Sequence, residues 1–175
     1  MKVAKFVIKG GKLLKGEVSV SGAKNSALKA FAASILFKNS IQVENVPLIE
    51  DMFRIKEMLS ACGVRVSNSG NKTFSFIAPE NAGTDLDEIM SQRFRASVVL
   101  LGPMLTRYGR VSITHPGGCV IGKRPINFFI DGFKAMGAKV REAGDRYFFE
   151  AQKLKSADFA FLVPSVTATE TLMMA

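Results

Sequence analysis

The sequence predicts a mixed α/β fold in which a repeated unit surrounds enclosed helices. Short strand-like and helix-like segments alternate along the 175 residues. The order strand, proline, helix, glycine, hairpin occurs twice, and Gly63 and Gly137 end the two helices. Two further segments, AFAASILF and ASVVLLGPMLT, are apolar on every side, which is typical of a helix enclosed by other elements. Periodicity leaves an ordinary α+β sandwich open as the alternative.

The expected elements follow from period and flanking residues. Strand-like segments are short, apolar or alternating, and bounded by turn residues. They are residues 2–8, 16–20, 41–46, 64–67, 73–77, 110–113, 139–141, 146–151 and 159–163. Helix-like segments show helical spacing or helix-terminal residues. They are residues 25–36, 47–62, 87–108, 125–136 and 165–175. The last helix stops without a terminating glycine, which predicts a fragment of a longer chain.

Individual residues predict where the helices end or bend. In residues 47–62, Met52, Ile55 and Leu59 form one apolar stripe, and a C-terminal glycine follows directly. Pro103 is expected to kink or break the helix of residues 87–108, because proline lacks an N–H and clashes with the preceding turn. Pro125 suits the first position of the next helix.

The second copy of the repeat contains an enlarged loop. Five additional residues separate its proline from its glycine, and they lie in the segment GGCVIGKR at residues 117–124. Loops frequently carry binding and catalytic residues. A loop that is longer in only one copy is therefore a candidate for function.

Composition excludes several classes of protein. A content of 47% apolar and 22% charged residues excludes a disordered chain. No apolar run approaches the roughly 20 residues needed to span a membrane, and the lysine-rich N-terminus is not a secretory signal. Two cysteines do not form a disulfide framework, which predicts a cytoplasmic protein. The net charge of +9 predicts anionic partners, while the absence of Trp and of any five-residue basic block speaks against nucleic acid.

Lys24 and Asn25 stand in the segment SGAKNSAL, where strand-like residues give way to a helix. Backbone N–H groups at a helix start and a neighbouring lysine together form a site for an anion. The spacing matches neither a P-loop nor a GxGxxG nucleotide motif. The alternative is that Ser21 or Asn25 caps the helix and Lys24 lies in solvent.

Cys119 lies in the enlarged loop, HPGGCVIGKRP, with Lys123 and Arg124 close behind it. Flexible backbone and nearby cations favour a reactive thiol; a cysteine without a role is the alternative. Cys62 lies on an apolar helix stripe, which predicts a small core residue. A metal site is not supported, since the chain has one His and no CxxC or HExxH pattern.

Arginines mark the starts of two helix-like segments. Arg93 and Arg95 flank Phe94 at the entry of an apolar helix, and Arg124 directly precedes Pro125. Arginine beside a helix N-terminus binds phosphate or carboxylate groups well. Solvated surface arginines are the alternative.

Five segments occur in the order that one enzyme family shows: GGKLLKGEVSVSGAKNSAL, RFRASVVLLGPML, HPGGCVIGKRPI, GFKAMGAKV and PSVTATETLM. By these segments the chain resembles the enolpyruvyl transferase family, and within it the members that act on UDP-N-acetylglucosamine. Members that act on shikimate 3-phosphate lack the cysteine loop and are a distant second. The family fold consists of two similar domains, each an inside-out α/β barrel of repeated units around buried helices.

The resemblance implies that the enolpyruvyl group of phosphoenolpyruvate moves to the 3′-hydroxyl of UDP-N-acetylglucosamine, as the first committed step of peptidoglycan synthesis. It implies a tetrahedral intermediate, release of phosphate, and no metal or organic cofactor. Lys24 and Asn25 would bind phosphoenolpyruvate, Arg124 would clamp its phosphate, and Arg95 would contact the UDP-sugar. Cys119 would donate the proton to the methylene carbon and form covalent adducts, including one with the epoxide fosfomycin. The implied uridine site consists of Pro125, Ile126, Asn127, Phe128, Val163, Pro164, Ser165 and Val166.

Three residues depart from the family pattern. Asn127 stands where Asp is common, Phe129 where His is frequent, and Thr167 where Gly is usual. These changes affect nucleotide affinity more than reaction type, and they leave a non-catalytic UDP-sugar-binding paralogue as the alternative function. The resemblance further predicts that residues 1–21 pack with a second barrel domain, which supplies an aspartate and further arginines. Residues 22–175 would form a partial UDP-sugar-binding barrel, inactive alone, with no nucleic-acid or membrane partner.

Overall fold

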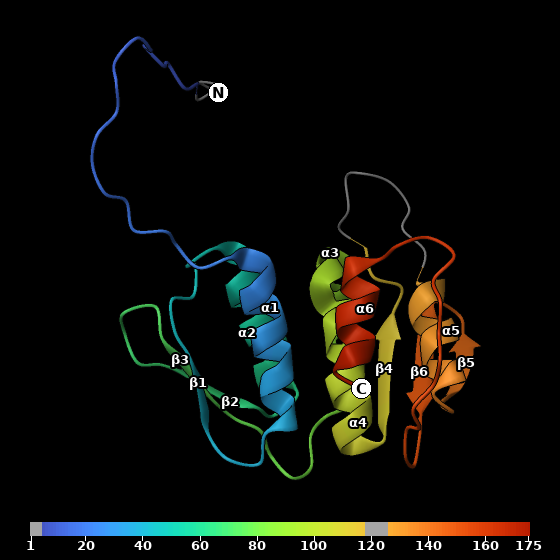
Figure 1. Ribbon diagram of the computed structural model, residues 1–175. Helices are drawn as coiled ribbons and strands as arrows, with labels where there is room; N and C mark the ends of the chain where they lie inside the picture. Colours follow the sequence, from blue (N-terminus) through green and yellow to red (C-terminus); the bar gives the residue numbers. More distant parts are fainter. Residues whose placement is uncertain (1–4, 118–125) are drawn as a thin grey trace.

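The predicted repeat is confirmed as two copies of one topology. The computed structural model describes residues 5–117 and 126–175. The first copy consists of β1 (Ile41–Val43), α2 (Glu50–Ala61), β2 (Arg65–Asn68) and β3 (Phe74–Ile77). The second consists of β4 (Arg110–Thr114), α5 (Asn127–Ala135), β5 (Lys139–Ala143) and β6 (Arg146–Glu150). In each copy the last strand lies in the middle of the sheet, antiparallel to both neighbours, so the orders are β1-β3-β2 and β4-β6-β5 (Figure 1).

The helices predicted to be enclosed lie in the middle of the molecule. The elements outside the two copies are α1 (Lys24–Ala33), the 3-10 turn η1 (Ser34–Leu36), α3 (Glu88–Arg93), the 3-10 helix η2 (Arg95–Leu100), α4 (Leu101–Tyr108) and α6 (Val166–Met173). Figure 1 shows α1, α4 and α6 with one sheet on each side. Residues 98–101 are at most 2% exposed and belong to one hydrophobic core with both repeats. Within the described part of the chain, no helix combines the length and apolarity needed to cross a membrane.

Aromatic rings join each sheet to a helix. The ring of Phe31 on α1 lies 4.6 Å from that of Phe76 and 5.4 Å from that of Phe74. Both β3 rings reach α1 because alternate side chains of a strand share one face. In the second copy, Phe133 on α5 lies 5.5 Å from Phe149 on β6. Tilted and edge-to-face rings at these distances stabilise the contact beyond simple burial.

Glycine residues allow two helices to end in left-handed backbone and allow two other helices to pack closely. Gly63 (φ +93°) and Gly137 (φ +90°) directly follow the C-caps of α2 and α5 in left-handed conformation, as predicted. At Gly102 on α4, an added Cβ would lie 2.2 Å from the carbonyl oxygen of Thr171 on α6. Helices α4 and α6 can therefore approach this closely only because residue 102 has no side chain.

Arg107, near the end of α4, connects this helix to the first repeat. Its guanidinium donates hydrogen bonds to four backbone carbonyl oxygens. The acceptors are Ile35 at 2.6 Å, Phe37, and Ala78 and Pro79 at 3.3 Å each. One side chain thus joins the end of η1 and the end of the first sheet to α4, on the side of the fold opposite the start of α1.

The helix predicted for residues 87–108 is interrupted at Phe94 and not at Pro103. Phe94 has extended backbone (φ −132°, ψ 94°), which separates α3 from η2 and α4. Pro103 is the third residue of α4, and η2 continues directly into α4 through Leu100, which has helical backbone (φ −75°, ψ −19°). Proline is tolerated in the first turn of an α-helix, the chain stays helical on both sides of it, and the prediction of a break at this residue is wrong.

Three predicted strands do not form in the described residues. Residues 5–20 run away from the core as an exposed extended chain, and residues 159–163 join no sheet (Figure 1). The remainder of the first predicted strand, residues 2–4, lies outside the described range. Extended chain becomes a strand only when another strand accepts and donates its backbone hydrogen bonds. The described sheets contain no such partner for these segments.

Candidate functional site

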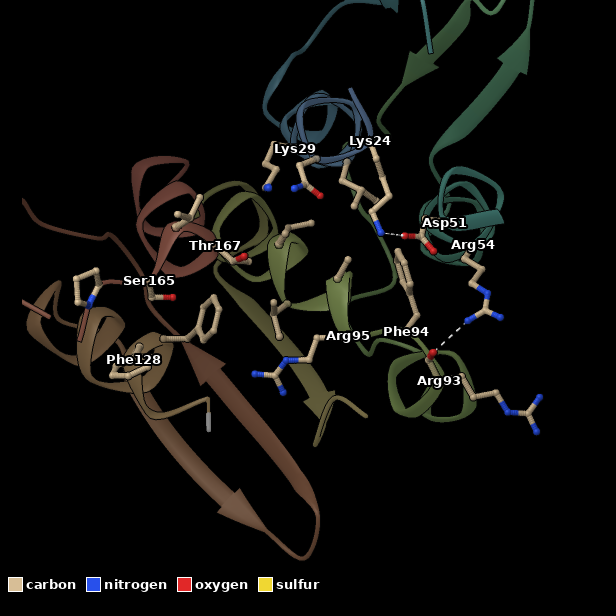
Figure 2. A pocket seen from close by; sticks show the side chains of 18 of the residues that line it. Lys24, Lys29, Asp51, Arg54, Arg93, Phe94, Arg95, Phe128, Ser165 and Thr167 are labelled. Atoms are coloured by element: carbon tan, nitrogen blue, oxygen red, sulfur yellow. Dashed lines mark hydrogen bonds and ion pairs between the residues drawn. The ribbon is translucent and has the colours of Figure 1, made fainter. Parts of the chain in front are cut away.

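A cavity of about 780 Å³ opens at the N-terminal ends of several helices. Its walls come from the first turns of α1 and α2, the α3–η2 junction, α5 and residues 163–167 (Figure 2). The cationic lining residues are Lys24, Lys29, Arg54, Arg93 and Arg95. Asp51 is the one acidic lining residue in the described part of the chain. The volume is typical of a small-molecule site, and the excess of cations favours an anionic ligand.

Lys24 is the first residue of α1 and reaches across the cavity to α2. Its Nζ lies 2.5 Å from Oδ2 of Asp51, and the two side chains are 51% and 30% exposed (Figure 2). Asn25 also lines the cavity. The N-cap residue is Ala23, and no side chain in the described residues caps the helix, so the alternative of Ser21 or Asn25 as the cap is wrong. The helix N-terminus therefore adds its partial positive charge to that of the lysine.

Two arginines at the α3–η2 junction point in different directions. Phe94 separates them, and Figure 2 shows Arg93 and Arg95 pointing to opposite sides. Arg95 donates a hydrogen bond to the carbonyl oxygen of Pro116 at 3.2 Å. The carbonyl oxygen of Arg93 accepts one from Arg54 at 3.1 Å. Arg95 thus connects the cavity wall to the start of the enlarged loop.

The wall opposite α2 is largely apolar and comes from α5 and residues 163–167. Phe128 on α5 lines the cavity, and its ring lies 6.0 Å from that of Phe161, edge to face. Ser165 caps α6 by accepting a hydrogen bond from the N–H of Ala168 at 3.3 Å. This wall therefore offers an aromatic face beside a polar helix start.

Many of the predicted site residues gather in this cavity. Those that line it are Lys24, Asn25, Arg95, Phe128, Val163, Pro164, Ser165 and Val166. Ile126 is 1% exposed in the core, and Asn127 is exposed as the first residue of α5; neither lines the cavity. Cys119, Arg124 and Pro125 lie outside the described residues, so their predicted roles stay predictions.

The start of the enlarged loop is held against α3. The N–H of Gly117 donates a hydrogen bond to the carbonyl oxygen of Ser91 at 3.3 Å. An added Cβ on Gly117 would lie 2.0 Å from the carbonyl oxygen of Gln92. Only glycine allows this approach, which brings residue 117 beside the cavity wall two positions before Cys119.

Cys62 is buried, in agreement with its prediction as a core residue. Burial, and to a lesser degree the nearby Asp85 carboxylate, raises the pKa of its thiol to about 11. The thiol is therefore protonated and unreactive at neutral pH. In the residues that the structure describes, no three His, Cys, Asp or Glu side chains are arranged to hold a metal ion.

The ion pairs around the cavity were not predicted from the sequence. Arg54 donates two hydrogen bonds to Glu50, and Lys29 pairs with Glu170 on α6 at 2.8 Å. Acidic residues in the first turn of a helix usually stabilise the helix dipole, so Asp51 gave no sign of a site. Lys29 and Glu170 are too distant in sequence for their pairing to be predicted.

Comparison with known proteins decides the family. The sequence model of the EPSP synthase (3-phosphoshikimate 1-carboxyvinyltransferase) family matches residues 8–175. The chain belongs to this family. Its curated relatives include UDP-N-acetylglucosamine 1-carboxyvinyltransferase of Geobacter metallireducens, 41% identical over 174 residues, and UDP-N-acetylglucosamine 1-carboxyvinyltransferase 2 of Clostridium tetani, 39% identical over 172 residues. Each match covers 98% of this chain and 41% of the relative, so the chain spans less than half the length of these relatives.

Solved structures agree on the fold. The enolpyruvyl transferase NikO from Streptomyces tendae matches with a TM-score of 0.67 and 24% identity, over 83% of this chain and 32% of that one. EPSP synthase from Acinetobacter baumannii matches with a TM-score of 0.73 and 17% identity, over 94% and 38%. The chain therefore has the α/β fold of the enolpyruvyl transferases, as the resemblance predicted.

Proposed function

We propose that this chain forms part of an enzyme that transfers the enolpyruvyl group of phosphoenolpyruvate to the 3′-hydroxyl of UDP-N-acetylglucosamine. The hydroxyl oxygen loses its proton and bonds to C2 of phosphoenolpyruvate while a proton is added to the methylene carbon. Loss of a proton from the resulting methyl group and of phosphate from C2 restores the double bond. The main support is one cationic cavity in which residues from separate family motifs gather. The names of relatives at 36–41% identity support the choice of acceptor.

The proposed roles follow the chemistry of each side chain. Lys24 and Asn25 hold phosphoenolpyruvate at the start of α1, where a cation and helix N–H groups stabilise developing negative charge. Arg124 clamps the phosphate, and Arg95 contacts the UDP-sugar. Cys119 donates the proton to the methylene carbon as a general acid. Its sulfur also forms the adducts with phosphoenolpyruvate and fosfomycin.

The nucleotide end of the acceptor is assigned to the wall formed by α5 and the start of α6. The proposed uridine site consists of Pro125, Ile126, Asn127, Phe128, Val163, Pro164, Ser165 and Val166. An aromatic face such as that of Phe128 stacks on a nucleobase, and the ring of Phe161 packs against this ring edge to face. Buried Ile126 acts by fixing the start of α5.

The proposed architecture is an inside-out barrel of repeated units, of which residues 22–175 form part, in a cytoplasmic enzyme. Residues 1–21 pack with a second barrel domain that completes the active site, so the 175 residues alone are inactive. Supporting this, Phe6, Ile8 and Leu14 are 99%, 89% and 91% exposed, an arrangement that apolar side chains adopt at unfilled interfaces. The relatives are also more than twice as long as this chain.

The test is carboxyvinyl transfer by the protein expressed from its complete reading frame. We expect phosphate release when phosphoenolpyruvate and UDP-N-acetylglucosamine are both present. Shikimate 3-phosphate is the control acceptor and is expected to give only background release. Transfer to shikimate 3-phosphate instead, or to neither acceptor, would show that the proposal is wrong.

Replacement of Lys24 tests the anion site. Lys24→Ala is expected to lower turnover at least about 10- to 150-fold, because a charge-assisted contact contributes roughly 1.5–3 kcal/mol. Lys38→Ala is the matched control, since Lys38 is exposed beyond the other end of α1. Near-normal turnover of Lys24→Ala would place this lysine outside the reaction.

A further inference from the structure

Asp51 is an unexpected residue in a cavity that otherwise attracts anions. It is the one acidic side chain among the described lining residues, and its Oδ2 lies 2.5 Å from Nζ of Lys24. Figure 2 shows the two side chains pointing toward each other across the gap between α1 and α2. A carboxylate at this distance offsets most of the lysine charge that a phosphate would otherwise meet.

The other ion pairs around the cavity use carboxylates that do not line it. Glu50, 75% exposed, pairs with Arg54, whose guanidinium also donates to the carbonyl oxygen of Arg93. Glu170 pairs with Lys29 and joins α6 to α1. Asp51 differs because its carboxylate lines the cavity and pairs with the first residue of α1.

We propose that Asp51 is a positioning residue that competes with anionic substrate for Lys24. This inference rests on the proposed function. The Asp51 carboxylate holds the lysine between α1 and α2 in the open cavity. Phosphoenolpyruvate must displace it to reach the ammonium group, and Asp51 takes Lys24 back when inorganic phosphate leaves. Asp51 therefore lowers the affinity for substrate and product alike, and it prevents the cavity from retaining phosphate.

The deciding variant is Asp51→Asn in the protein expressed from its complete reading frame. The amide keeps the size of the side chain and an oxygen that accepts a hydrogen bond from Lys24, but it removes the negative charge. We expect the KM for phosphoenolpyruvate and the inhibition constant of phosphate to fall together by about fivefold, the scale of one exposed ion pair. Their ratio stays unchanged because both anions displace the same carboxylate. Asp51→Ser, which also removes the charge, is expected to move both constants in the same direction.

Glu57→Gln is the matched control. Glu57 lies on α2, as Asp51 does, so its replacement changes the net charge equally. Its side chain is exposed and does not line the cavity, whereas Glu50 pairs with the lining residue Arg54 and is therefore unsuitable. We expect both constants to stay within about twofold of wild type, since a single exposed charge outside the cavity contributes little.

Each outcome decides the inference. Unchanged constants in Asp51→Asn, with only a lower melting temperature, would show that Asp51 merely connects two helices. A large fall in kcat with unchanged constants would make Asp51 a proton-transfer group and overturn the proposal. Absence of carboxyvinyl transfer in the wild type would refute the proposed function. Asp51 is then still tested by calorimetric titration with inorganic phosphate, where tighter binding to Asp51→Asn supports the inference and equal binding refutes it.

Discussion

Gly117→Ala tests whether α3 holds the chain that leads to Cys119. A Cβ at residue 117 would lie 2.0 Å from the carbonyl oxygen of Gln92, whereas ordinary contacts begin at 3.4 Å. The backbone must therefore move by about 1 Å or more, and a misplacement of about 1 Å near reacting groups lowers rates roughly 100-fold. We expect turnover and the rate of Cys119 alkylation by fosfomycin to fall together by about this factor.

Mass spectrometry of the protein with UDP-N-acetylglucosamine and fosfomycin measures the alkylation rate. Gly83→Ala is the matched control, because its Cβ would lie 3.6 Å from the nearest atom and strain nothing. Wild-type alkylation and turnover in Gly117→Ala would refute the argument that contact with α3 positions this segment. An equal loss of turnover and alkylation in Gly83→Ala would show that the effect comes from general destabilisation of the protein.

Three further predictions concern stability and nucleotide binding. Arg107→Leu leaves four carbonyl oxygens without their donor. The free energy of unfolding is therefore expected to fall by about 3 kcal/mol and the melting temperature by roughly 6–12 °C. An unchanged melting temperature would contradict the role of Arg107 in joining α4 to the first sheet. The folded-state pKa of Cys62 is about 11 against an ordinary 9.0, so the unfolded thiol loses its proton first as pH rises. Denaturant titrations should therefore show stability falling between these two pH values, and Cys62→Ala should lack this fall. Asn127→Asp is expected to alter the affinity for UDP-N-acetylglucosamine, measured by calorimetry, more than turnover at saturation; the opposite result would remove Asn127 from the uridine site.

The repeated unit and its helices could be predicted because short-range patterns specify them. Apolar spacing at Met52, Ile55 and Leu59 defines one buried face of α2, and glycine ends that helix in a conformation other residues adopt poorly. The same pattern recurs in the second copy, and both copies adopt the same sheet order. The motif residues also predicted much of the cavity wall, since Lys24 and Phe128 both line it.

Only the tertiary structure decided which residues distant in sequence contact each other. Residues 5–8, 16–20 and 159–163 have the composition of strands, yet a strand also needs a neighbouring backbone, which no local pattern supplies. The Asp51 carboxylate looks like an ordinary helix-start residue until packing of α1 against α2 brings it to Lys24. The sequence by itself determined most of the helices and the six strands that pair in the described residues, because propensity and period act over a few residues. The folded chain determined the charge balance of the cavity, because Coulomb interactions depend on distances that only packing sets.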